Sequence, residues 1–343
     1  MQYKITRPSR LLNAKGELIQ KGYSTAPILK YTREDVARKI RLKEWDYYLI
    51  YNEDYAVALT VGKSNALFLI SVSLLNLKNK KEITKSVIRI VPNRMLTLPE
   101  SSQSGDIIYK DKNVDVSFLH HGRMRDIHLF LNSFTKDSPL EVSFQIAKEP
   151  KDSMVIATPF PEDKKAFYYN RKIIGMRTLG SVRYKSKVYT FQPYNSFALL
   201  DWGRGVWPYK TTWYWGAGQG LVNGNLFGFN LGYGFGNTSA ATENMLFFNG
   251  KASKLEDITF HIPRNCNNEY DYLKPWAITS SDHRFEMEFI PILDRSVNLS
   301  ALMLSTNQHQ VFGKYSGYAV LEDGIMVYIK DFLGFAERVE NRW

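Results

Sequence analysis

Short runs of alternating apolar and polar residues, separated by turn residues, extend through most of this 343-residue sequence. In the run VDVSFLH, residues 114–120, the alternation has a period of two, which is the signature of a half-buried strand. Similar runs follow one another from Trp45 to about residue 148, and the pattern resumes after residue 165. Because no crossover helices separate these runs, the sequence predicts antiparallel barrels or sandwiches.

A proline-rich segment, EPKDSMVIATPFPEDKK at residues 149–165, interrupts this strand pattern. The chain is also longer than a usual single domain. We therefore predict an all-β protein made of two antiparallel barrel or sandwich units in tandem, residues 1–150 and 151–343, with the glycine- and tryptophan-rich stretch in the second unit.

Local signals predict several turns and one helix. Asn-Gly at 249–250 predicts a hairpin, and Asp-Gly at 323–324 predicts a second one. The apolar run at 57–75 is interrupted by polar residues 63–65, so it predicts two strands and a turn rather than a membrane span. Residues 32–44, TREDVARKIRLKE, are a helix candidate that a threonine could cap, with acidic residues in its first turn.

The cysteine content and the first residues bear on the cellular compartment. The single cysteine, Cys266, cannot form an internal disulfide, which favours a reducing compartment. The first twenty residues contain no continuous apolar core of the kind found in signal peptides. We therefore expect a cytoplasmic protein without a transmembrane segment.

The net charge of +11 is unevenly distributed. Residues 1–100 contain 18 Lys and Arg against 9 Asp and Glu, whereas residues 101–343 contain 27 against 25. The basic segments are mixed in sign and accompany no recognised nucleic-acid-binding module, so we expect no nucleic-acid partner. An anionic small ligand or peripheral contact with a membrane surface remains open.

Residues 201–250 concentrate glycines and aromatic side chains. They contain 11 of the 22 glycines and 12 aromatic residues, but only four charged ones. Glycine lets a ligand or another backbone approach a strand closely, and Trp and Tyr supply rigid contact area. This mixture favours one wall of an apolar pocket, although core aromatics packed beside small residues would also account for it.

Three charged residues of this region are the candidates for catalysis: Asp201, Arg204 and Glu243. A carboxyl group in apolar surroundings has a raised pKa and can donate a proton near neutral pH. Arg204 could tune such a group, or it could form an ion pair that merely holds a loop to a strand. The sequence leaves open whether these side chains face a pocket or one another.

Further residues are expected to contact a ligand. Trp213 and Trp215 should share one strand face, with Tyr214 on the other. The expected ligand contacts are Trp202, Trp207, Tyr209, Trp213, Trp215, Asn244 and His309. The histidines and the single cysteine complete no zinc-ligand spacing, and GAGQG is not followed by a helix, so we expect neither a metal nor a phosphate-binding cofactor.

Several phrases, including LLDWGRGVWPYKTTWYWGAGQG, ATENMLFFNGK and EDGIMVYIKDFLGFAE, resemble a bacterial family known as domain of unknown function 2804. The resemblance runs from about residue 13 to Trp343. It implies a calycin-like fold related to carotenoid hydratases, some of whose kin hydrate or cyclise isoprenoid and polyketide-like substrates with acid residues. The matching motif positions are Asp201, Trp202, Arg204, Trp207, Trp213, Trp215, Glu243, Asn244, His309, Gln310, Gly313, Glu337 and Trp343.

These observations lead to three functional hypotheses, all with a hydrophobic or otherwise stacking small-molecule ligand. The first is a proton-catalysed lyase or isomerase, of hydratase or cyclase type, with Glu243 or Asp201 as the acid. The second is a non-enzymatic carrier of a lipid or isoprenoid. The third is a carbohydrate-binding or carbohydrate-processing protein, because sugars also stack on tryptophan.

Overall fold

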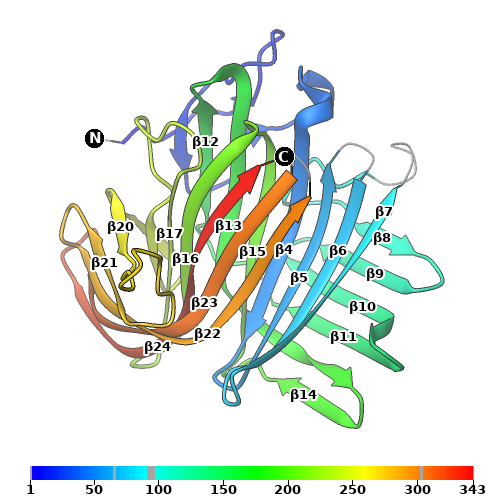
Figure 1. The fold of residues 1–343 in the computed structure, drawn as a ribbon. Helices are drawn as coiled ribbons and strands as arrows, with labels where there is room; N and C mark the ends of the chain where they lie inside the picture. Colours follow the sequence, from blue (N-terminus) through cyan, green and yellow to red (C-terminus); the bar gives the residue numbers. More distant parts are fainter. Residues whose placement is uncertain (1, 65–66, 91–96, 148, 302–303, 343) are drawn as a thin grey trace.

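The computed structural model describes residues 2–64, 67–90, 97–147, 149–301 and 304–342. Two large antiparallel sheets, each curled into a half-barrel, make up most of this part of the chain (Figure 1). The predicted all-β fold with two units in tandem is confirmed.

The first sheet contains thirteen strands from the first 206 residues, with the central order β7-β6-β5-β4-β15-β13-β11-β10-β9-β8. Strand β12 pairs with β13 and β2, and β14 pairs with the C-terminal end of β13. The strands are β2 (Gly22–Ser24), β4 (Leu42–Tyr51), β5 (Tyr55–Ser64), β6 (Leu67–Asn76), β7 (Lys81–Ile90), β8 (Ile107–Lys110), β9 (Val114–His121), β10 (Met124–Thr135), β11 (Ser138–Ile146), β12 (Met154–Phe160), β13 (Asp163–Tyr184), β14 (Lys187–Phe191) and β15 (Phe197–Val206).

The second sheet contains nine strands in the order β19-β18-β17-β16-β24-β23-β22-β21-β20. Its strands are β16 (Lys210–Val222), β17 (Asn225–Tyr233), β18 (Met245–Phe248), β19 (Lys251–Lys254), β20 (Ile258–His261), β21 (Trp276–Ser280), β22 (Phe285–Ala301), β23 (Leu304–Val320) and β24 (Met326–Arg342). The chain therefore changes sheets between Val206 and Lys210, whereas the predicted division into units at residue 150 falls between two strands of the first sheet.

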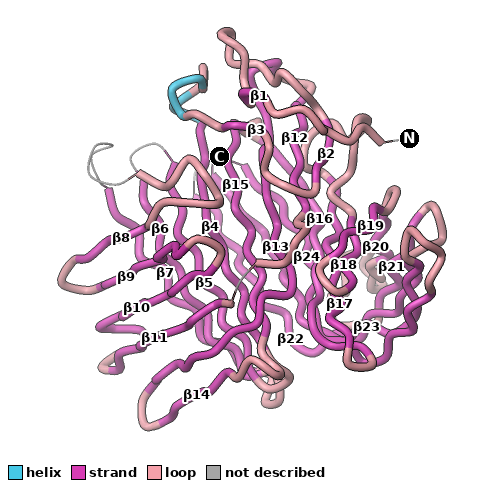
Figure 2. Tube along the Cα trace, turned by 180° about the vertical axis from the view of Figure 1, so that it is seen from behind, coloured by secondary structure: helices cyan, strands magenta, loops and turns pink. Residues whose placement is uncertain are grey.

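The segment predicted to be helical, residues 32–44, is not an α-helix. It contains two 3-10 turns, Arg33–Asp35 and Lys39–Arg41, without a side-chain capping hydrogen bond, and then enters β4 (Figure 2). The side chain of Arg33 donates to the Glu44 carboxylate at 2.9 Å. Such tertiary ion pairing replaces the local capping on which the helix prediction depended.

The predicted strands and turns agree better with the structure. The turn at 249–250 joins β18 to β19, and the turn around 323–324 joins β23 to β24. The apolar run at 57–75 contributes to β5 and β6. Of its predicted turn, residues 63–65, the first two belong to β5 and the third lies outside the described part. Two short strands, β1 (Ser9–Arg10) and β3 (Leu29–Lys30), form a separate parallel pair.

The two half-barrels meet along β13 and β16. Strand β13 has a register shift at Gly175, whose positive φ of 83° favours glycine and whose N–H donates to Gln219 of β16 at 2.7 Å. The larger apolar core continues across this junction, because Trp215 and Phe335 of the second sheet belong to it. The junction is therefore part of the main core and not a loose contact between domains.

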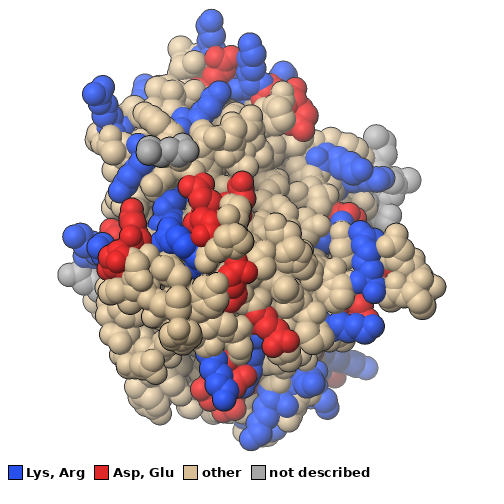
Figure 3. All heavy atoms as spheres, turned by 90° about the vertical axis from the view of Figure 1, so that its left-hand side faces the viewer, with Lys and Arg blue, Asp and Glu red and all other residues tan. Residues whose placement is uncertain are grey.

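Charged side chains lie mostly outside this core. On the face of the molecule shown in Figure 3, Lys and Arg are interspersed with Asp and Glu. This face therefore carries no broad patch of a single sign. Within the described residues, no helix is long and apolar enough to cross a membrane.

Candidate functional site

Two rows of side chains face each other at the junction of the sheets. In the first sheet, Tyr47 on β4, Asp201 on β15 and Lys172 on β13 are direct cross-strand neighbours. Because successive side chains of a strand alternate between faces, neighbours in register project from the same face of the sheet. This face is turned towards the second half-barrel.

The second sheet presents a matching row. Trp215 on β16, Glu337 on β24, Gln310 on β23 and Arg295 on β22 are successive cross-strand neighbours. The ammonium nitrogen of Lys172 lies 4.2 Å from the centre of the Trp215 ring, which joins this row to the first one. The registers of both sheets thus bring residues from seven strands into one place.

We call the buried groups of these two rows, with three residues that fill the space between them, the intersheet cluster. Its members are Tyr47, Tyr168, Asn170, Lys172, Asp201, Trp215, Glu243, Arg295, Gln310 and Glu337. None of them is more than 8% exposed. Charged residues are almost never buried to this extent without partners, so the contacts of each decide what the cluster can do.

A continuous chain of polar contacts links two carboxyl groups of the cluster. Asp201 accepts a hydrogen bond from Asn170 at 2.6 Å and forms an ion pair with Lys172 at 3.1 Å. Lys172 donates to the Tyr168 hydroxyl at 3.4 Å, and that hydroxyl donates to Oε2 of Glu243 at 3.3 Å. These contacts join Glu243 to Asp201 through Tyr168 and Lys172.

Glu243 reaches the cluster from the segment between β17 and β18. It lies over Gly232, where a Cβ atom would come within 2.1 Å of Oε1, so only glycine leaves room for the carboxyl group. That Oε1 atom is buried and has no hydrogen-bond partner among the described residues. Burial raises the pKa of Glu243, opposed by the charge of Lys172 and assisted by that of Asp201.

Glu337 is the third carboxyl group. Trp213 Nε1 donates to one of its oxygens and Gln310 Nε2 to the other, each at 3.0 Å. Burial raises the pKa of Glu337 to about 7, although the Trp213 hydrogen bond and the charges of Arg295 and Lys172 act in the opposite direction. This carboxyl group therefore changes its protonation near neutral pH.

Aromatic rings connect the cluster to the surface. Trp207 lies at the centre, with ring centroids 5.4 Å from Trp213, 5.5 Å from Tyr168 and 5.9 Å from Trp45. Phe235 stacks on Tyr168 at 4.9 Å. Trp45 and Trp213 are only half-buried, so this aromatic layer extends from the cluster to solvent.

The structure brings together seven of the residues that the sequence singled out. Five belong to the cluster: Asp201, Trp215, Glu243, Gln310 and Glu337. Trp207 and Trp213 belong to the aromatic layer. Trp213 and Trp215 share one face of β16, as predicted, because both contact groups at the junction. Their proposed roles in ligand binding and catalysis stay predictions.

Arg204 and Trp202 lie on the opposite face of β15 from Asp201. Arg204 is fully buried and pairs with Asp46 at 3.0 Å and with Glu44 at 3.6 Å. Its guanidinium group also lies 4.1 Å from the centre of the Trp202 ring. Arg204 is therefore placed to neutralise carboxylates inside the first half-barrel rather than to tune Asp201.

The other predicted ligand contacts are dispersed. Tyr209 is 46% exposed, on the connection between β15 and β16. Asn244 accepts the Gly232 N–H at 2.7 Å, and thus supports the strand beneath Glu243. His309 projects from the other face of β23, where Nδ1 lies 2.7 Å from Asp294. Trp343 lies outside the described residues.

The sequence analysis missed five members of the cluster. Tyr168, Asn170 and Lys172 form a two-residue repeat in FYYNRKI, and this spacing on a strand places all three on one face. The pattern was a usable signal, since polar groups at alternate positions of an otherwise apolar strand need buried partners. Tyr47 and Arg295 carry no comparable local signal.

The cluster is closely packed, so the predicted open pocket stays a prediction. Surface grooves of about 320 and 410 Å³ lie elsewhere, one beside β7 and β10 and the other beside residues 25–27. A ligand would reach the carboxyl groups by displacing side chains of the aromatic layer. In the described part of the chain, no group of three or more His, Cys, Asp or Glu residues could hold a metal ion.

Known structures share this fold. A Nitrosomonas europaea protein described as AttH aligns over 92% of this chain and 96% of its own, with a TM-score of 0.56 and 10% identity. CghA, in a structure with Sch210972, aligns over 97% of both chains, with a TM-score of 0.50 and 9% identity. Kievitone hydratase from Nectria haematococca aligns over 98% of both, with a TM-score of 0.49 and 11% identity. The first two likenesses place the chain among proteins built from two calycin-like half-barrels, and at these identities they show the fold alone.

The chain belongs to the family Domain of unknown function (DUF2804), whose model matches residues 2–343. The family resemblance of the tryptophan-rich motifs is thereby confirmed, over slightly more of the chain than those motifs cover. A comparison with curated protein sequences gave no match.

Proposed function

We propose that the intersheet cluster is a proton-transfer site for an apolar small molecule, and that the protein is a lyase or isomerase of hydratase or cyclase type. The observation that carries this proposal is the set of three buried carboxyl groups, Asp201, Glu243 and Glu337, arranged around Lys172. Perturbed ionisable groups concentrate at functional sites, because keeping them buried costs stability without helping the fold.

The environments of two carboxyl groups assign them different roles. Burial raises the pKa of Glu243, so it retains a proton to higher pH than an exposed glutamate and suits a general acid. Asp201 is held in an ion pair with Lys172 and accepts from Asn170, so it suits a general base. In a dehydration, Glu243 would protonate a departing hydroxyl group as water leaves. Asp201 would remove a proton from the adjacent carbon, and the C–H electrons would form the double bond.

Tyr168 connects the acid to the base. Burial raises its pKa well above the ordinary value, so its hydroxyl group stays protonated while it bonds to Glu243 and Lys172. Passage of a proton through Tyr168 would restore both carboxyl groups after each turnover. The same groups used in reverse order would add water to a double bond or move it.

The aromatic layer supports an apolar substrate. Trp45, Trp207, Trp213 and Phe235 offer ring faces and edges between the cluster and solvent. CghA, which shares the fold, has been solved with the small molecule Sch210972, so this type of architecture accommodates such a ligand in that protein. The aromatic layer alone would equally suit a carrier of a hydrophobic ligand, which is the second candidate function.

Deuterium incorporation separates the two functions. Purified protein is incubated in D₂O with a hydrophobic metabolite extract, and bound and free compounds are identified by mass spectrometry. Deuterium enters carbon when the double bond is protonated, so an enzyme of this type, working in the hydrating or isomerising direction, yields a compound with new carbon-bound deuterium. Glu243→Gln should reduce its formation at least about a hundredfold, since a general acid contributes factors of about 10²–10⁴.

The matched control is Glu141→Gln, which removes an exposed carboxyl group from the surface pair with Arg183. It should leave deuterium incorporation unchanged. A ligand that binds equally to wild type and Glu243→Gln, and gains no deuterium from either, would replace the enzyme proposal with the carrier. A bound sugar would instead favour carbohydrate binding.

A further inference from the structure

The segment that carries Glu243 is not part of a strand, so other contacts must fix its position. Glu243 points inwards, and only its Oε2 atom is held by a side chain of the first sheet. Its backbone carbonyl accepts from Asn230 at 2.9 Å. The residues on either side, Thr242 and Asn244, are bonded in the opposite direction, towards the outside of the second sheet.

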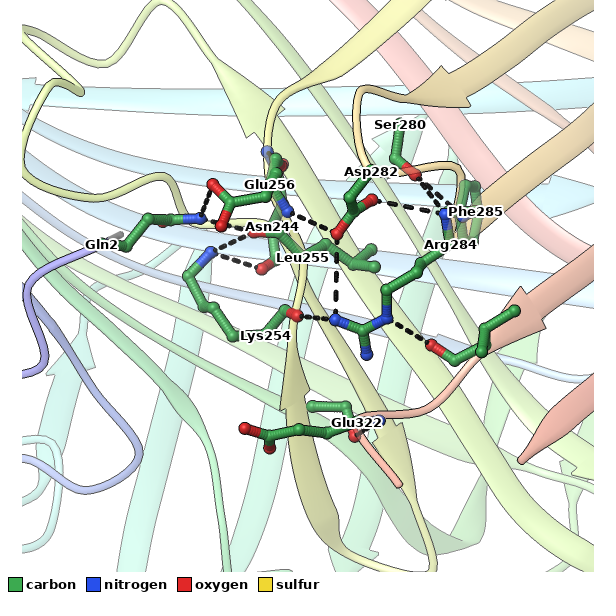
Figure 4. Close-up of polar contacts among 12 residues, drawn as sticks. Gln2, Asn244, Lys254, Leu255, Glu256, Ser280, Asp282, Arg284, Phe285 and Glu322 are labelled. Carbon is green, nitrogen blue, oxygen red and sulfur yellow. Dashed lines mark hydrogen bonds and ion pairs between the residues drawn. The ribbon is translucent and has the colours of Figure 1, made fainter. Parts of the chain in front are cut away.

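One ammonium group is bonded to both of these neighbours of Glu243. Figure 4 shows its bonds to the carbonyl groups of Asn244 and Leu255. Lys254, the last residue of β19, donates to the Thr242 hydroxyl at 2.8 Å and to the Asn244 carbonyl at 2.7 Å. Its third bond goes to the Leu255 carbonyl at 2.8 Å. All three N–H donors of the ammonium are thus used, and two of them hold the segment bearing Glu243.

The N-terminus holds the same segment. Gln2 accepts the Thr242 N–H at 2.7 Å and donates to the Leu255 carbonyl at 2.8 Å and to the Glu256 carboxylate at 2.9 Å. Figure 4 shows Gln2 approaching from one side of the segment and Lys254 lying beside it. Residues far apart in sequence therefore form one clamp behind Glu243.

The protonation state of Lys254 is sensitive to pH. Burial lowers its pKa to about 7, against the opposing effect of nearby carboxylates. A neutral amine has two N–H donors, so it can no longer donate all three of these hydrogen bonds. The titratable groups that act on the amine are Glu243, Glu256, Asp257 and Asp282, and the centre of the Tyr23 ring lies 5.3 Å from it. Nearby, Arg284 donates to the backbone carbonyl of Lys254, and Glu322 is hydrogen-bonded to Ser253.

We propose that Lys254, assisted by Gln2, is a positioning residue that holds Glu243 over Gly232 while the amine is protonated and releases it as the amine loses its proton. Lys254 contacts neither the aromatic layer nor Asp201, so it acts only through the segment at 242–244. The inference rests on the proposed function in treating Glu243 as the acid. It adds that Glu243 leaves its position over Gly232 when the pH rises above neutrality.

The position of Glu243 can be measured without a substrate. The δ-carbon of Glu243 is followed by NMR in protein labelled with ¹³C-glutamate, and assigned from the spectrum of Glu243→Gln. In Lys254→Met, released Glu243 gains water, and its titration midpoint should fall by roughly one pH unit towards the ordinary glutamate value. Lys251→Met, at an exposed lysine of the same strand, should leave the midpoint in place.

The opposite shift would overturn the proposal. If Lys254 acted only by its charge, its removal would raise the Glu243 midpoint, because a positive neighbour favours the carboxylate. An unchanged midpoint would overturn it as well. Should Lys254→Met fail to fold, Gln2→Ala provides the second variant, with a smaller fall in the midpoint expected.

Wild-type protein gives an independent test. Hydrogen exchange at the Thr242 amide, corrected for the intrinsic pH dependence, should accelerate several-fold as the pH passes about 7. Lys254→Arg, which stays charged, should keep the amide protected to pH 9. If Lys254→Met lowers the titration midpoint of Glu243 but no substrate is turned over, Lys254 positions Glu243 and the proposed chemistry is wrong. If a substrate is turned over but the midpoint does not move, only the positioning role of Lys254 is wrong.

Discussion

The two faces of β4, β13 and β15 are both buried and both charged, yet their charges are arranged differently. On the face inside the first half-barrel, Arg204 pairs with Glu44 and Asp46, and the two guanidinium groups of Arg125 and Arg171 share Glu149. On this face, each of these buried carboxylates forms an ion pair with at least one buried arginine.

The intersheet face has no such balance. The three carboxyl groups Asp201, Glu243 and Glu337 outnumber the two cations, Lys172 and Arg295. In addition, Oε1 of Glu243 has no hydrogen-bond partner in the described part of the chain. The comparison teaches that burial of charge alone does not mark a site. What distinguishes the intersheet face is its excess of carboxyl groups over cations, together with the burial that raises the pKa of Glu243 and of Glu337.

The largest effect is expected from removing the charge of Arg204. Arg204→Met should cost about 3–5 kcal/mol of the free energy of unfolding, because it leaves Asp46 buried without its cation and Glu44 with Arg33 alone. Urea unfolding measures this cost. Arg183→Met, which opens an exposed pair with Glu141, is the control, expected within about 1 kcal/mol. If Arg204→Met also cost no more than about 1 kcal/mol, the stability of the inner face would not depend on its ion pairs.

The second test concerns the pH dependence of Glu337. The folded protein holds this proton up to about pH 7, while the unfolded chain releases it near 4.5, so stability falls as the pH rises between these values. Glu337→Gln should remove up to about 3 kcal/mol of that fall. Urea midpoints at pH 5 and pH 8 give the difference. Parallel pH profiles of wild type and variant would contradict the raised pKa.

A smaller effect is expected from crowding Glu243. In Gly232→Ala the added methyl group would meet Oε1 of Glu243 and the Phe235 ring, and we expect a loss of about 1–3 kcal/mol. Gly62→Ala is the matched strand control, because its Cβ would make only ordinary contacts at 3.7 Å or more. Equal stability of the two variants would show that the carboxyl group moves away freely.

The smallest effect is expected from replacing Trp213, which tests whether its indole acts by hydrogen bonding or by packing. Trp213→Phe removes the donor to Glu337 and should cost about 1 kcal/mol. Since that hydrogen bond favours the charged carboxylate, the pKa of Glu337 should rise further, and the cost should be greater at pH 8 than at pH 5. The same urea series detects this difference, and a cost independent of pH would argue that the indole acts by packing alone.

Much of the fold was predictable from alternation. The run at 114–120 became β9, with buried and partly exposed residues alternating along most of its length. The helix prediction at 32–44 failed because Arg33 reaches Glu44 across the chain, and local propensity contains no information on that contact. Asp201 and Arg204 are three residues apart, so reading the segment as a strand would itself have placed them on opposite faces.

The candidate site was only partly predictable. The tryptophans and carboxyl groups of 201–250 stood out by composition, but the partners of Asp201 could not be read from it. The two-residue repeat places Lys172 on one face with Tyr168 and Asn170, but only the pairing of β13 with β15 shows that its partner is Asp201. Register over long separations, rather than local preference, determines which charges meet.

The continuous core between the half-barrels also has an evolutionary consequence. Asp201 and Lys172 come from the first sheet, and Glu243 and Glu337 from the second, so neither half contains the whole set. A gene fragment encoding one sheet would inherit half of a buried charge cluster with nothing to cover it. Recombination between relatives should therefore succeed only when both halves are exchanged together, which ties their mutational histories to each other.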